Sequence, residues 1–252
     1  MLKFFRENFI ITNDCIILAT PMVLFFIFLQ MYIQNFEYNL SSNLSYIIFY
    51  VTLWVVVSGS FAGWFYMVKK TLQFSKKTFL FDTDRVTALS KLVLCLFKGI
   101  GRFFLSFLVL VAVIVVLKIA KTFLIILFPI PFSLIYHSQL KSVYNLTVII
   151  TSIIEFLIYY GFIFWIPEIV YNYANPFKAI ISSFKKGFIT LRSTFWYYLV
   201  FCIFGIGLHF SIINSTTLPW LYFLLLLISY YFVLYTVILF FRHYEQNFTE
   251  EN

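Results

Sequence analysis

Apolar stretches of about 20 residues alternate with short polar segments along most of the chain. As an α-helix, a stretch of this length crosses the roughly 30 Å hydrocarbon core of a bilayer. The pattern predicts six membrane-spanning helices, at about residues 15–33, 46–68, 103–128, 143–166, 196–213 and 219–241. We expect consecutive spans to pair as three helical hairpins.

A second pattern precedes each predicted hairpin, with apolar residues at spacings of three and four and basic residues between them. Such spacing places the apolar residues on one face of a helix, and a basic amphipathic helix lies on an anionic membrane surface. We expect amphipathic cytoplasmic helices at about residues 2–13, 84–102 and 176–193. The last has the clearest stripe, formed by Phe177, Ile181, Phe184, Phe188, Leu191 and Phe195. Asn175 is a suitable N-cap for it, and Pro176 suits the first helical position.

Composition agrees with an all-α polytopic membrane protein, here one integral membrane domain over residues 1–252. Hydrophobic residues make up 62% of the chain and charged residues only 11%, whereas soluble domains average about 25% charged residues. The net charge of +8 therefore indicates orientation and contact with anionic lipid rather than nucleic acid. The three cysteines and three histidines form no metal-ligand spacing or catalytic motif, and we expect neither a cofactor nor an enzyme.

The distribution of basic residues predicts the orientation. All lysines and arginines except Lys118, Lys121 and Lys141 fall at the ends of the spans that share a side with the N-terminus. The positive-inside rule then places both termini in the cytoplasm. The basic residues of the amphipathic segments are candidates for contact with anionic lipid or with a cytoplasmic protein subunit: Arg85, Lys91, Lys98, Arg102, Lys178, Lys185, Lys186 and Arg192.

One carboxylate lies near the middle of a predicted span, where a charge is costly. This residue is Glu155, and Lys118 and Lys121 occupy the preceding span. At about 1.5 Å per residue, Lys118 lies nearer to its depth and Lys121 a turn further out. The three residues form either a structural ion pair or an ion or substrate site. Alternatively, Glu155 is protonated against neighbouring hydroxyls and both lysines reach for the outer interface.

The second predicted span contains small residues. Gly59 and Gly63 form a G-x-x-x-G pair, which lets two helix backbones approach closely. We expect this pair to pack against another helix of the same chain, with the contact face of a homo-oligomer as the alternative.

The run PFKAIISSFKKGFITLRSTFWYYL resembles bacterial six-span membrane protein families without an assigned activity. Among them is the membrane domain attached to some glycerophosphodiester phosphodiesterases. The residues that carry the resemblance are Pro167, Glu168, Ala179, Ser183, Phe184 and Lys185. It implies a protein of the bacterial cytoplasmic membrane. The catalytic phosphodiesterase domain is absent from this sequence, so its activity is not implied.

Three classes of function follow from these patterns. The first is a non-enzymatic membrane protein whose basic surface helices engage anionic lipid or a cytoplasmic partner. The second is a transport protein or the membrane subunit of a transporter complex, which an intramembrane Glu155 would suit. The third, a lipid-handling enzyme, lacks a recognisable catalytic constellation.

Overall fold

The computed structural model describes residues 2–37, 43–75, 85–127, 140–172, 175–215 and 218–249. Within these ranges the chain is helical and forms no strand, which confirms the all-α class. The elements in order are α1 (Leu2–Asp14), the short 3-10 helix η1 (Ile16–Leu18), α2 (Ala19–Glu37), α3 (Asn43–Ser75), α4 (Arg85–Leu127), α6 (Leu140–Gly161), α7 (Trp165–Asn172), α8 (Pro176–Ile189), α9 (Leu191–Asn214) and α10 (Pro219–Phe248).

Among the described residues, five helical segments are long and apolar enough to cross a membrane. They are Leu44–Gln73, Lys91–Leu127, Tyr144–Asn172, Leu191–Asn214 and Pro219–Phe248. The chain is therefore a multi-pass membrane protein. The first predicted span is less regular, because the chain turns at Cys15 and the apolar part of α2, Thr20–Ile33, is shorter than the others.

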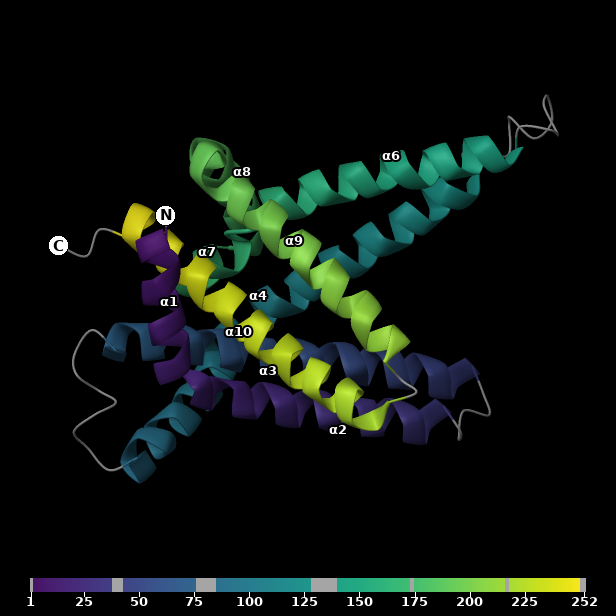
Figure 1. Ribbon diagram of the computed structural model, residues 1–252. Coiled ribbons are helices and arrows are strands. Elements are labelled where there is room, and N and C mark those ends of the chain that lie inside the picture. Colours follow the sequence, from purple (N-terminus) through teal and green to yellow (C-terminus); the bar gives the residue numbers. More distant parts are fainter. Residues whose placement is uncertain are drawn as a thin grey trace.

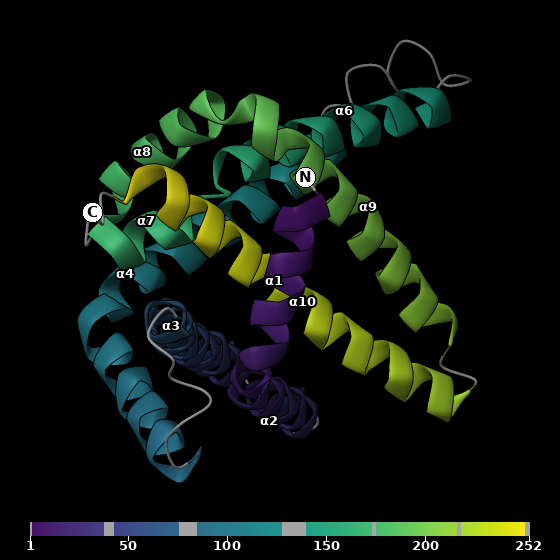
Figure 2. The same ribbon diagram turned by 60° about the vertical axis from the view of Figure 1, so that its left-hand side comes forward.

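The helix pairs α2 and α3, α4 and α6, and α9 and α10 extend from one end of the molecule (Figure 1). Helices α2 and α3 lie side by side, the C-terminal part of α4 approaches α6 at its far end, and α9 meets α10 in the same way. Figure 2 shows that the pairs point in different directions. Helices α1, α7 and α8 gather at the opposite end, together with the last turns of α10.

The segments expected as a surface helix at 84–102 and a span at 103–128 form one uninterrupted helix, α4. No proline occurs between Arg85 and Leu127, so nothing removes a backbone donor at the expected junction. Figure 2 shows that α4 changes direction along its length. Its N-terminal part thus leaves the apolar body without a break in the helix.

The helical structure is interrupted on either side of α7. Helix α6 ends at Gly161, and a turn at 162–164 leads into α7. The candidate span Tyr144–Asn172 therefore contains a turn and a short helix that the sequence pattern did not predict. Helix α7 tolerates Pro167 because it lies in the first turn. Helix α8 begins as predicted, with Pro176 at its start and the side chain of Asn175 accepting the N–H of Phe177.

Close approach of α3 and α4 depends on two glycines. A Cβ on Gly63 would lie 2.9 Å from the carbonyl oxygen of Leu96, and one on Gly99 would lie 2.6 Å from the Cβ of Tyr66. Gly63 therefore lies at a helix contact within the chain, where a larger residue would separate the backbones. Gly59 is less constrained, since its nearest neighbour is the ring of Phe104 at 3.8 Å.

The first and last helices are tied together by polar contacts. Arg242 of α10 forms an ion pair with Glu7 at 2.6 Å and donates a hydrogen bond to the side-chain oxygen of the buried Asn8 at 3.0 Å. The hydroxyl of Tyr231 donates to the side chain of Asn13 at 2.8 Å. These bonds hold α1 against α10, and the two helices cross in Figure 2.

Candidate functional site

Helix α8 packs against its neighbours through small residues. Ala179, Ser183 and Gly187 follow one another at intervals of four, so they lie on one face, and all three are buried. The hydroxyl of Ser183 donates to the carbonyl oxygen of Gly161 at 2.7 Å. A side chain on Gly161 would collide with the ring of Phe184, because its Cβ would lie 2.1 Å from a ring carbon. Helix α8 is thus fitted closely onto the end of α6.

A tyrosine secures the junction between α8 and α9. The hydroxyl of Tyr160 donates to the carbonyl oxygen of Gly187 at 3.0 Å and lies 2.8 Å from the hydroxyl of Thr194. The helix is interrupted at Thr190, between these two partners. One side chain of α6 therefore holds both sides of the break, which sets the direction in which α8 leaves α9.

The opposite side of α8 exposes large apolar side chains. Phe177, Ile181 and Phe188 are 59%, 72% and 66% exposed. At about 100° per residue, the exposed Lys178 and Lys185 lie in the sector beside them. Arg192, at the start of α9, is also exposed. In an interfacial helix, the apolar sector enters the acyl region and the adjoining basic sector meets lipid headgroups.

The N-terminal part of α4 repeats this arrangement in part. Leu92 and Gly99 are buried, Val93 and Phe97 are exposed, and the basic residues off the buried face are exposed as well. These basic residues are Lys91, Lys98 and Arg102. The side chain of Arg85, the remaining candidate in this segment, lies outside the described side chains.

Lys186 does not share the exposure of Lys185. Its ammonium group forms an ion pair with Glu168 of α7 at 2.6 Å, and the side chains of Lys186 and Glu168 are only 18% and 5% exposed. Lys186 also donates to the hydroxyl of Tyr244 at 2.7 Å and lies over the rings of Tyr244 and Phe248. The expectation that Lys186 contacts lipid or a partner therefore does not fit its position, because this charge is already used inside the protein.

Glu168 is the centre of a polar network that joins three helices. Besides Lys186, it accepts hydrogen bonds from Asn172 at 2.8 Å, from Ser182 at 2.9 Å and from the hydroxyl of Tyr244. These donors come from α7, α8 and α10. Charge-assisted hydrogen bonds of this kind are among the stronger ones in proteins. The network fastens α8 to the last turns of α10.

A lysine of α3 contributes to the same region. Lys69 is buried and donates to the carbonyl oxygen of Val170 at 2.9 Å, with its ammonium group 4.6 Å from the ring centre of Tyr171. Val170 lies in the last turn of α7, where cations interact favourably with the free carbonyl groups of a helix. Lys69 thereby links α3 to α7.

Sequence reasoning did not identify the partners in this network. Glu168 appeared only through the family resemblance, and Tyr244 carried no signal at all. Lys186 and Tyr244 are 58 residues apart, and no periodicity reports a contact over that separation. The buried small-residue face of α8 was the one available indication that this side of the helix has a partner.

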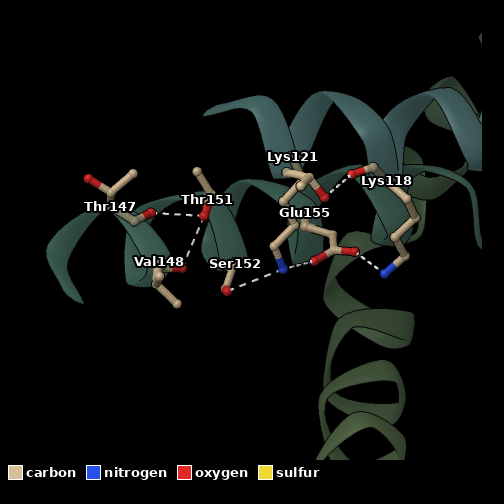
Figure 3. A network of polar contacts seen from close by, with 8 residues as sticks. Lys118, Lys121, Thr147, Val148, Thr151, Ser152 and Glu155 are labelled. Carbon is tan, nitrogen blue, oxygen red and sulfur yellow. Dashed lines mark hydrogen bonds and ion pairs between the residues drawn. The ribbon is translucent and has the colours of Figure 1, made fainter. Parts of the chain in front are cut away.

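The three predicted intramembrane residues lie together between α4 and α6 (Figure 3). The ammonium group of Lys118 lies 2.5 Å from Oε1 of Glu155, and that of Lys121 pairs with Oε2. Lys121 also approaches the hydroxyl of Ser152 at 3.5 Å, and Lys118 lies 5.3 Å from the ring centre of Tyr159. Lys121, placed a turn too far out by the depth estimate, thus reaches Glu155 as well as Lys118 does.

Neither polar cluster resembles a metal centre. Within the ranges that the structure describes, no group of three or more His, Cys, Asp or Glu residues is arranged to hold a metal ion. Comparisons of the chain with protein-family models, with curated proteins and with solved structures find no match.

Proposed function

We propose that this chain is a non-enzymatic protein of the bacterial cytoplasmic membrane whose basic surface elements bind anionic lipid, with α8 as the main contact. One observation carries the proposal: the exposed half of α8 combines an apolar sector with an adjoining basic sector, while its other half is fixed to α6 and α7. A helix held in this way lies at the interface as a permanent part of the protein.

The proposal includes six spans in three hairpins with both termini cytoplasmic. The gathering of α1, α8 and the end of α10 at one end of the molecule supports it (Figure 1). The basic residues of α8 lie at that end, where the positive-inside rule expects them. A reporter fused after Asn252 is expected to be cytoplasmic.

Neutralising the exposed basic residues of α8 and of the start of α9 tests the lipid contact. Each Lys or Arg near an anionic surface contributes about 1 kcal/mol. The triple variant Lys178→Gln, Lys185→Gln, Arg192→Gln is therefore expected to bind anionic lipid on the order of a hundredfold more weakly. Native mass spectrometry of the protein purified in mild detergent, with phosphatidylglycerol added in steps, measures the bound lipid.

The matched control keeps the charge, in the variant Lys178→Arg, Lys185→Arg. It is expected to retain phosphatidylglycerol as the parent protein does. Neutralising Lys91 and Lys98 in a separate variant measures how much of the lipid binding depends on α4. Unchanged retention of phosphatidylglycerol in the triple variant would contradict the proposal. If the parent protein copurifies with a stoichiometric soluble subunit that the triple variant no longer binds, a cytoplasmic protein partner is favoured instead.

A membrane subunit of a transport complex is the second candidate. It is favoured by the charged residues Glu155, Lys118 and Lys121 within the otherwise uncharged stretches 103–127 and 144–161. Ionisable residues in spans commonly mark ion or substrate pathways. Its test is a mild-detergent pull-down from native membranes, in which a copurifying ATPase is the expected result.

A further inference from the structure

The cluster between α4 and α6 carries an excess of positive charge. In the described side chains from Phe103 to Leu127 and from Tyr144 to Gly161, the acidic and basic residues are Lys118, Lys121 and Glu155. One carboxylate faces two ammonium groups, so the fully charged cluster has a net charge of +1. An uncompensated charge within a span costs at least about 2.5 kcal/mol, and a counter-anion removes that cost.

The two ammonium groups also have hydrogen-bond donors to spare. Each lysine has three N–H donors, and Glu155 takes one from each. The contact of Lys121 with Ser152 is long, at 3.5 Å. Lys118 is 58% exposed while Glu155 is 20% exposed. Lys121 is 27% exposed, so the accessible part of the cluster is the Lys118 side chain.

The lysines do not extend toward the outer interface. Lys118 lies nine residues before Leu127, the last residue of α4, which is about 14 Å along the helix. A lysine side chain that reached for the headgroups would point along the helix toward that end. Figure 3 shows instead that both side chains converge on Glu155.

An apolar groove adjoins the cluster. Leu117 and Leu124 of α4 line it together with Ile154 and Ile158 of α6, and Lys121 and Glu155 also border it. Binding sites for small molecules combine such apolar walls with a few polar groups that fix orientation. The groove therefore places apolar walls beside Lys121 and Glu155, whereas Lys118 lies outside its lining.

We infer that Lys118 and Lys121 bind a phosphate- or carboxylate-bearing anion within the membrane, with Glu155 holding the two lysines in place. The anion is either the headgroup of an anionic lipid or a free anion that reaches the cluster. This site is distinct from the surface of α8, and it goes beyond the lipid contact proposed there.

The variant Lys118→Gln removes the excess charge and keeps the Lys121–Glu155 pair, so it is the sharpest test. Losing one charge-assisted hydrogen bond is expected to weaken anion binding about tenfold or more. The neutral triple variant Lys118→Gln, Lys121→Gln, Glu155→Gln is expected to bind no anion here and leaves no buried charge unpaired. All basic residues of α8 remain, so failure of this site and failure of the α8 contact give different results.

Two measurements on the full chain separate the sources of the anion. The first is the rise in thermal midpoint with inorganic phosphate, in a zwitterionic detergent at constant ionic strength. The second is phosphatidylglycerol retention by native mass spectrometry. A response to phosphate lost in Lys118→Gln supports a free anion, and one bound lipid lost in Lys118→Gln supports a lipid headgroup. A parent protein that responds to neither probe, or a Lys118→Gln variant that responds as the parent does, overturns the inference.

Discussion

Replacing Lys186 by methionine breaks the ion pair that fixes α8 while keeping the length of the side chain. Glu168 then remains in a site where it is 5% exposed, without a cation. Removing one partner of a buried pair typically costs 3–5 kcal/mol, roughly, because the other charge is left uncompensated. Glu168 keeps its hydrogen bonds from Asn172, Ser182 and Tyr244, which places the loss near the lower limit. We expect about 3 kcal/mol, on the order of a hundredfold in the unfolding equilibrium.

The adjacent residue provides the control. Lys185 has the same chemistry on the same helix but is exposed, so Lys185→Met is expected to change the free energy of unfolding by no more than about 0.5 kcal/mol. Unfolding of both variants is followed by tryptophan fluorescence during titration with sodium dodecyl sulfate in mixed micelles. The indole of Trp165 is suited to this, since it donates to the carbonyl oxygen of Pro176 at the start of α8.

A double variant identifies the cause of the loss. If the unpaired carboxylate is responsible, adding Glu168→Gln to Lys186→Met recovers part of the lost stability, because the amide is neutral and still accepts hydrogen bonds. Equal losses in Lys186→Met and Lys185→Met would refute the reasoning. A double variant whose loss of stability equals the sum of the losses in Lys186→Met and Glu168→Gln, each measured alone, would refute it as well.

Two further substitutions test packing at specific contacts. Gly99→Ala is expected to lose about 1–3 kcal/mol in the same titration, because the added carbon meets α3. Gly101→Ala, two residues along with nothing within 4 Å of its Cβ position, is expected to gain up to about 1 kcal/mol, and equal stability of the two would contradict the close α3–α4 contact. Tyr160→Phe is expected to lose about 1 kcal/mol and to raise amide hydrogen exchange around Thr190. Unchanged exchange there would show that the hydroxyl does not secure the junction.

Local signals in the sequence predicted the local features well. Asn175 and Pro176 begin α8 as expected, because capping needs only neighbouring residues. Of the apolar stripe of α8, Phe177 and Phe188 are exposed, whereas Phe184 packs against Gly161. In a membrane, large apolar side chains can face lipid, and the side that contacts other helices is marked by small residues instead.

The features that were missed depend on distant contacts or on weak local signals. Helix α7 has only eight residues, which are too few for a periodic pattern. Its Pro167 is as typical of the residues that follow a helix as of the first turn of a new one. Lys185 and Lys186 are adjacent and chemically identical, yet one is exposed and the other forms an ion pair with Glu168. The partner of each charge is decided by which helices meet, and the sequence pattern does not report that.

The bonds between α1 and α10 have a consequence for biosynthesis. Asn8 and its partner Arg242 are separated by 234 residues, so at roughly 5–20 residues per second the ribosome needs on the order of 10–50 s to deliver the second after the first. During that interval α1 has neither the ion pair of Glu7 nor the hydrogen bond of Asn8 available to it. Docking of α1 onto α10 thus follows the synthesis of all the helices that lie between them in the sequence.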